Sequence, residues 1–185
     1  MDTPLVDKKT VRHWKVDVNH TSLHFCVGYI GLVEVRGHFT QYDGLVETEG
    51  DGFNSAKVTM LVKAESINTA NAIRDNHLRS SDFFAVDKFP DITFVSSSFT
   101  SLGSDKYLLL GELSIKGISK EIGFHVLFKG FTKNIFGEQV AVFTAKSEIN
   151  RLDFNLIWHP ILENGFPVVS EKVLIDLIVE LHQLE

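Results

Sequence analysis

An alternation of apolar and polar residues, repeated in segment after segment, constrains the fold of this chain more than any other feature. Between residues 56 and 63, one face carries Ala56, Val58, Met60 and Val62, whereas the other carries lysine and threonine. Successive side chains of a β-strand point to opposite faces of a sheet, so this period of two predicts a half-buried strand. Similar patterns recur at residues 13–17, 22–27, 34–42, 107–115, 122–128, 140–149 and 173–181.

Short turns such as SLGSDK and KGISK separate most of these segments, which favours antiparallel strands over βαβ units. Roughly eight or nine strands in one domain must close or stack, because long unpaired edges promote aggregation. We therefore predict an all-β fold, an antiparallel barrel of about eight strands. An interior of that size is either filled by side chains or holds one small ligand.

The stretch from Glu65 to Phe94 interrupts this pattern. Asn68 or Thr69 is expected to cap a short helix whose packed face carries Ala70, Ile73 and His77, with Asp75 paired to Arg79. Several phenylalanines follow the helix, and Pro90 ends any helical continuation. The stretch is thus predicted to be a short helical insert between two strands, which plugs or covers the barrel.

Five segments of the chain resemble the YceI-like family. They are SINTANAIRDNHLRSSDFFAVDKFPDITF from Ser66, WKVDVNHTSLHFCVGYIGLVEVRGHF from Trp14, GELSIKGISKEI from Gly111, INRLDF from Ile149 and VVSEKVLIDLIVEL from Val168. The resemblance covers nearly the whole chain and implies one lipocalin-like barrel domain, residues 1–185. It also implies a bound apolar ligand, a polyisoprenoid lipid or a quinone, and favours a homodimer.

The rows of apolar residues predicted to point inward contain almost nothing polar, so a cavity between them would take a chain-like apolar molecule. A completely packed barrel fits the same pattern equally well, and only the resemblance favours a cavity. The predicted ligand-binding residues are Met60, Val62, Phe83, Phe84, Phe89, Phe94, Leu113, Phe124, Val126, Phe128, Ile175 and Leu177.

Four basic residues are candidates for holding a charged head group of such a lipid: Arg74, His77, Arg79 and Arg151. An arginine can bind a pyrophosphate or carboxylate through two parallel hydrogen bonds. The alternative is structural. The residues of the insert would satisfy backbone groups at the barrel rim, and Arg151 would pair with Asp153.

Composition narrows the possible partners. A formal net charge of −6 and the lack of a Lys/Arg cluster argue against a nucleic-acid partner.

No apolar window is long enough for a membrane span, and the single cysteine, Cys26, allows no intrachain disulfide. The first fourteen residues lack an export signal, so we expect a cytoplasmic protein. Leu174 and Ile178, on the outer face of the last strand, fit a homodimer contact.

The sequence contains no recognisable motif for catalysis, a metal or a cofactor. His20 and His24 are about 13 Å apart along an extended strand and could share an ion only if the turn folds them together. His77 with Ser80 and Ser81 lacks the strand-turn-helix elbow of a serine nucleophile. We therefore predict a non-catalytic carrier or sequestering protein for a long-chain apolar ligand, with no cofactor. A filled barrel that binds a partner is the alternative, and an enzyme acting on a lipid head group is the third hypothesis.

Overall fold

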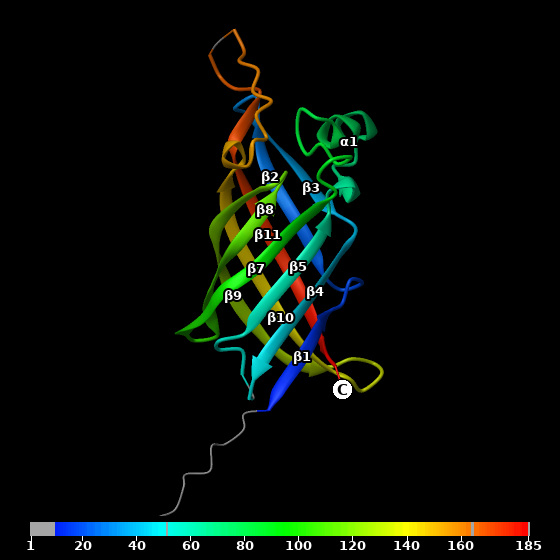
Figure 1. Cartoon of the computed structure of the whole chain (residues 1–185), viewed down its shortest axis with the longest axis vertical. Coiled ribbons are helices and arrows are strands. Elements are labelled where there is room, and N and C mark those ends of the chain that lie inside the picture. Colours follow the sequence, from blue (N-terminus) through cyan, green and yellow to red (C-terminus); the bar gives the residue numbers. More distant parts are fainter. Residues whose placement is uncertain (1–9, 51, 164, 185) are drawn as a thin grey trace, which may run out of the picture.

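A computed structural model describes residues 10–50, 52–163 and 165–184. Strands dominate it, and one short α-helix lies at one end of an elongated barrel (Figure 1). The elements are β1 (Val11–Val16), β2 (Ser22–Tyr29), β3 (Val33–Phe39), β4 (Tyr42–Glu49), β5 (Lys57–Lys63), η1 (Ala64–Ser66), β6 (Ile67–Asn68), α1 (Ala72–Arg79), β7 (Asp91–Gly103), β8 (Lys106–Ile115), β9 (Ile118–Lys133), β10 (Gln139–Asn150), η2 (Arg151–Phe154) and β11 (Val169–Gln183).

The predicted fold is confirmed: eight antiparallel strands close into a ring in the order β1-β4-β5-β7-β8-β9-β10-β11, and β11 returns to β1. Strands β2, β3 and β6 extend the sheet from the other part of β11. β11 therefore pairs with β2 between Val169 and Ile178 and with β1 between Leu181 and Gln183. The predicted strand at 34–42 is in fact two strands, since residues 40 and 41 form a bend between β3 and β4.

Alternation places the core inside the ring. Buried apolar residues come from the inward face of each strand of the ring. Among the described residues, no helix is long and apolar enough to cross a membrane. Gly111 allows a close approach between two strands. A Cβ atom there would lie 2.5 Å from the ring of Phe94 and 2.5 Å from the carbonyl oxygen of Val95, so a larger residue would displace the ring.

The insert, defined from here on as residues 64–90, leaves the ring after β5 and returns to it at β7. The backbone N–H of Ala64 donates to the carbonyl of Pro90 (2.8 Å), so its two ends meet. Within the part of the insert that the structure describes, ladder pairing is confined to Ile67 and Asn68, which pair with β3. The insert is therefore an excursion from the barrel wall, and Figure 1 shows it at the upper end of the molecule.

The helix of the insert differs from the prediction in its cap and its packed face. The cap is Asn71, whose side chain accepts the N–H of Arg74 (3.0 Å). Thr69 instead donates its N–H to the buried carboxylate of Asp75 (2.9 Å), and Ala70 adopts a left-handed φ of 58°, so helical geometry cannot begin earlier. The prediction that Asn68 or Thr69 caps the helix is wrong.

The predicted apolar face of the helix is also wrong, because Ile73 is 85% exposed. Leu78 contacts the core instead. The predicted pairing of Asp75 with Arg79 is replaced by separate contacts: Asp75 binds Thr69, whereas Arg79 donates to the carbonyl of Glu65 (2.7 Å).

Candidate functional site: the apolar cavity of the barrel

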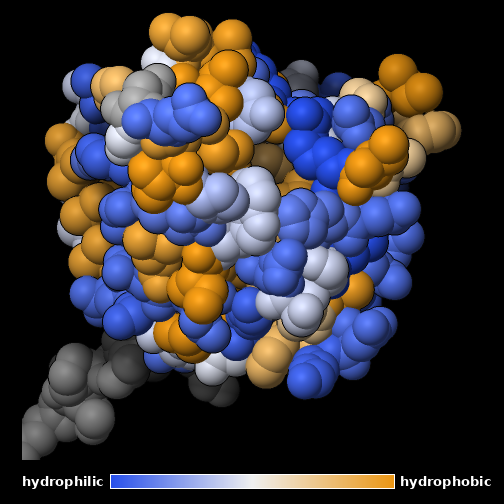
Figure 2. Space-filling view, turned by 90° about the horizontal axis from the view of Figure 1, so that it is seen from above, coloured by the Kyte–Doolittle hydropathy of each residue, from blue (hydrophilic) through white to orange (hydrophobic). Residues whose placement is uncertain are grey.

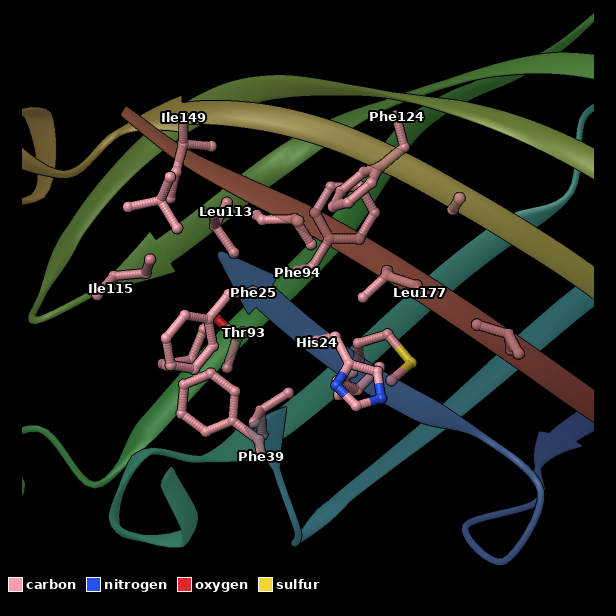
Figure 3. Close-up of a pocket in the computed structure, with 18 of the residues that line it drawn as sticks. His24, Phe25, Phe39, Thr93, Phe94, Leu113, Ile115, Phe124, Ile149 and Leu177 are labelled. Carbon is pink, nitrogen blue, oxygen red and sulfur yellow. The ribbon is translucent and has the colours of Figure 1, made fainter. Parts of the chain in front are cut away.

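The barrel encloses a cavity of about 270 Å³ (Figure 3). Its wall is built from inward-facing residues of most strands and from the insert, and only His24, Thr93 and Arg151 among its lining residues have polar side chains. An apolar cavity of this size stays dry unless an apolar molecule fills it, because water inside would lack hydrogen-bond partners. The interior is therefore suited to an apolar ligand and unsuited to a polar substrate.

Ten of the twelve predicted ligand-binding residues line this cavity. They are Met60, Val62, Phe83, Phe84, Phe94, Leu113, Phe124, Val126, Ile175 and Leu177. Figure 3 shows Phe94, Leu113, Phe124 and Leu177 projecting from different strands into the same space. Strand periodicity thus located the wall of the cavity. Whether these residues contact a ligand stays a prediction.

Phe89 and Phe128 lie outside the cavity lining, contrary to their predicted place. Phe89 belongs to the turn before β7 and covers Gly117 at the tip of the β8–β9 hairpin, where a Cβ atom would lie 2.8 Å from its ring. Phe128 follows the inward alternation of β9, but it packs against Phe53 and Phe143 with ring centroids 5.7 and 5.0 Å apart. Both rings therefore contribute to packing at the ends of the barrel.

Aromatic rings close the end of the cavity remote from the insert. We call this cluster the aromatic plug: Trp14, Phe53, Phe128, Phe131 and Phe143. Phe53 lies at its centre, 5.2 Å from Trp14 and 4.8 Å from Phe143 between ring centroids, and is 2% exposed. Such edge and tilted contacts are favourable beyond the area that they bury. The cavity is thus sealed at this end by packed side chains.

The insert covers the opposite end. Leu78, Phe83 and Phe84 point from it into the cavity. The Phe84 ring meets Phe39 of β3 edge-on with centroids 6.0 Å apart, and Phe83 lies 5.6 Å from Trp158. The insert therefore forms the apolar roof of the cavity.

Lys116 joins the insert to the loop after η2. Its ammonium donates to the carbonyl of Ser81 in the insert (3.1 Å) and to the carbonyl of Asn155 (3.0 Å). Partial burial lowers the pKa of Lys116, and the nearby Asp82 opposes that shift. His77 adds an edge-on contact with Trp158, with ring centroids 5.0 Å apart. These few polar and aromatic contacts hold the roof in place.

The three predicted head-group residues of the insert have structural roles and do not line the cavity. Arg74 donates to the hydroxyl of Thr69 (2.7 Å) and to its carbonyl (2.8 Å). Arg79 donates to the carbonyls of Glu65 (2.7 Å) and Ile67 (2.8 Å), and the Nε2 atom of His77 lies 2.9 Å from a carboxylate oxygen of Asp82. These contacts match the structural alternative, in which the residues of the insert bind groups of the chain itself.

Arg151 is the one head-group candidate that reaches the cavity wall, yet the residue is 2% exposed and its guanidinium binds the chain itself. It donates to the carbonyls of Ser170 (2.8 Å), Val169 (3.1 Å) and Leu156, and one nitrogen lies 3.0 Å from Nδ1 of His159. Burial lowers the pKa of Arg151, and the charge of Glu171 counteracts this. Arg151 does not form the predicted pair with Asp153.

Several residues of the site escaped the sequence reasoning. Phe25 and Phe39 line the cavity from β2 and β3, and Phe25 lies directly across from Ile175 of β11. Their alternation with polar neighbours carried the signal, but the position of β2 beside β11 did not follow from the order of strands in the chain. Trp158 lies in an irregular loop, where no periodicity marks it.

The candidate catalytic cluster at His77 is not assembled for nucleophilic chemistry. The hydroxyl of Ser80 donates to the backbone carbonyl of His77 (2.7 Å), and the imidazole binds Asp82 instead. His24 and His38 lie together, with ring centroids 5.6 Å apart, on neighbouring strands. His24 is thus separated from His20, which lies in the turn between β1 and β2.

A closed antiparallel barrel around an apolar cavity is the architecture of a lipocalin-like protein. This chain belongs to the YceI-like family, since the family's YceI-like domain model matches residues 14–181. It is 36% identical over 165 residues to a UPF0312 protein of Staphylococcus aureus strain MSSA476, a match that covers 89% of this chain and 94% of that protein.

Solved structures agree with this fold. BcnA of Burkholderia cenocepacia superposes with a TM-score of 0.76 at 20% identity, covering 89% of this chain and 98% of that one. The YceI protein of Campylobacter jejuni gives 0.72 at 27% identity, with 85% and 90% covered. A polyisoprenoid binding domain from Saccharophagus degradans, implicated in plant cell wall breakdown, gives 0.66 at 14% identity, with 91% and 97% covered.

Proposed function

We propose that this protein binds a long-chain apolar molecule, a polyisoprenoid lipid or a quinone, inside the barrel and carries or sequesters it without chemical change. The observation that supports the proposal most strongly is the cavity of about 270 Å³ with its almost wholly apolar wall. The affinity would come from burial, at about 0.8 kcal/mol for each methylene removed from water.

Two further observations support this proposal. The Saccharophagus degradans domain, which shares the fold, is described as polyisoprenoid binding. In addition, Arg74, Arg79 and Arg151 already donate to the chain's own oxygens, so these three arginines offer little for a charged head group. We therefore propose that recognition is dominated by the tail.

The experiment is mass spectrometry of an organic extract of the purified protein, together with native mass spectrometry of the intact complex. The matched variants place the same ring on either side of β10. Ala145→Phe adds it to a residue that lines the cavity, whereas Lys146→Phe adds it to an exposed neighbour. We expect a stoichiometric lipid in the wild type and in K146F and its loss in A145F.

A wild-type protein that holds no lipid and gains no thermal stability from added lipids would contradict the proposal. That result would favour the second candidate, a barrel that acts through its outer surface.

Two exposed residues on the outer face of β11, Leu174 and Ile178, each 48% exposed, favour such a contact, and we propose that they join two copies of the chain. Light scattering that gives the mass of one chain would exclude this dimer. The cytoplasmic location remains a prediction, which cell fractionation tests.

A further inference from the structure

Four side chains of types that can bind metals gather on the outer surface of the barrel, where β1 and β11 meet. We call the pairing of these two strands the seam. Glu180 and His182 point outward from β11, because Leu181 between them is buried and lines the cavity. Asp17 follows β1, and its N–H donates to the carbonyl of Glu180 (2.9 Å). His20 completes the group from the turn that leads to β2.

The donor atoms of Asp17, Glu180 and His182 all lie within 4.8 Å of one another, which suits one ion. Oδ2 of Asp17 is 3.1 Å from Nε2 of His182 and 2.6 Å from Nδ1 of His20. Oε1 of Glu180 is 3.1 Å from the same atom of His182 and 3.6 Å from the same atom of His20. Ligands held about 2.0–2.1 Å from a tetrahedral Zn²⁺ are themselves about 3.3–3.4 Å apart. The two distances to His182 lie close to this value, so small side-chain shifts suffice for Asp17, Glu180 and His182 to coordinate one ion.

A further carboxylate lies on the other side of the His182 imidazole. While Nε2 of that ring faces Asp17 and Glu180, its Nδ1 lies 3.6 Å from Oε2 of Glu138. Metal-binding histidines commonly donate their second ring nitrogen to a carboxylate, which fixes the tautomer and strengthens the ligand. Glu138 is itself held by the side-chain amide of Asn134 (2.7 Å).

The charge of the cluster also suits a cation. Among the described residues, the ion pairs of Asp17 and Glu180 are formed with histidines only. Lys15, which lies across the seam from His182, approaches Asp43 instead (3.6 Å). Among the described residues, Asp17 and Glu180 thus pair with no lysine or arginine, and a divalent ion would balance their charge. Imidazole and carboxylate together suit Zn²⁺ and its transition-metal neighbours.

We propose that Asp17, Glu180 and His182 form a binding site for a divalent transition-metal ion, with Glu138 as the outer partner of His182 and His20 as a neighbour in contact with Asp17. The ion would strengthen the closure of the barrel. The seam comprises only three residue pairs, from Trp14–Gln183 to Val16–Leu181, whereas β10 and β11 pair along eleven. The site lies outside the cavity, so its role is independent of the proposed lipid.

The test is isothermal titration of tag-free, chelator-treated protein with ZnCl₂ at about pH 7.5, where free imidazole is mostly neutral. Co²⁺ provides a second readout, because its visible absorption reports the ligand geometry. We expect one equivalent of metal, an increase in Tm and a four-coordinate Co²⁺ spectrum. His182→Gln should abolish all three, and Glu138→Gln should weaken binding by about tenfold or more.

The matched control is His125→Gln, which removes an exposed imidazole of β9 and should leave binding unchanged. Circular dichroism of each variant separates loss of the site from loss of the fold, and E138Q changes only an exposed residue. No saturable binding to the wild type would overturn the proposal. So would equal affinities of the wild type, H182Q and E138Q. The lipid content of the same samples is a separate readout, so either proposal can fail alone.

Discussion

Replacing the buried Arg151 by methionine tests whether this residue holds the fold together or serves a ligand. Methionine keeps much of the length and apolar stem of the side chain but removes every donor. The carbonyls of Leu156, Val169 and Ser170 then lose the guanidinium that they share. Leu156 lies in the loop after η2, and Val169 and Ser170 lie at the start of β11. The substitution therefore removes the side chain that links this loop to β11.

The size of the effect follows from these three acceptors. A buried acceptor left without a donor costs about 1–3 kcal/mol, and neighbouring losses are not fully additive. We therefore expect the free energy of unfolding to fall by about 3–6 kcal/mol. With a urea dependence of about 2 kcal/mol per molar, the unfolding midpoint falls by about 1.5–3 M.

The assay is equilibrium urea unfolding of wild type, Arg151→Met and Arg79→Met. Arg79 also donates to two carbonyls, those of Glu65 and Ile67, but at a more exposed site where water can replace it. R79M should therefore cost only about 1 kcal/mol. An equal, small loss in both variants would refute the reasoning, as would an R151M protein that keeps its stability but selectively loses affinity for phosphorylated lipids.

Three further predictions concern other parts of the barrel. Phe53→Ala removes the centre of the aromatic plug and should cost about 3–5 kcal/mol in urea unfolding; a cost below about 1 kcal/mol would contradict the packing described. Gly117→Ala, at φ 75° and with its Cβ 2.8 Å from Phe89, should lower stability by about 1–3 kcal/mol, and an unchanged Tm would exclude this strain. Burial and the carboxylate of Glu34 raise the pKa of Cys26 above its ordinary value of 9.0, so alkylation should reach half its maximal rate at a higher pH than for a free thiol, and Glu34→Gln should lower that pH.

Strand periodicity predicted the barrel wall because a strand that buries one face carries an apolar residue at every second position. Met60 and Val62 on β5 follow this alternation, as do Ile175 and Leu177 on β11. All four line the cavity. Phe128 shares the same alternation but lies at the plugged end. Alternation identifies the inward face of a strand and does not say how far along the barrel the open space extends.

The roles of the arginines could not be predicted in the same way. Their partners are backbone carbonyls, and every residue has one, so the sequence contains no signal for the pairing of Arg151 with Val169 and Ser170. Likewise, Asn68, Thr69 and Asn71 are all acceptable helix caps. The choice of Asn71 depends on the contact between Thr69 and Asp75.

The cluster at the seam shows the same limit for a site assembled by topology. His20 and His24 have the spacing that a search for metal ligands notices, but they point to different neighbours. His20 lies beside Asp17 and beside Glu180, about 160 positions further along the chain, and His182 contacts the same two carboxylates. Only the register that pairs Lys15 with His182 brings them together, and that register follows from closure of the ring.

The two ends of the cavity differ in what must break to open them. Four of the five rings in the aromatic plug belong to paired strands of the barrel: Trp14 on β1, Phe128 and Phe131 on β9, and Phe143 on β10. Opening the cavity at this end therefore requires these strands to separate. The two ends of the insert meet at Ala64 and Pro90, its only ladder is the short pairing of Ile67 and Asn68 with β3, and the rest of the described insert is held by side chains and by the contacts of Lys116. Exposed apolar residues also surround this end, which Figure 2 shows from above. Displacement of the roof leaves the ring intact, so the insert offers the less costly route between the cavity and the outside.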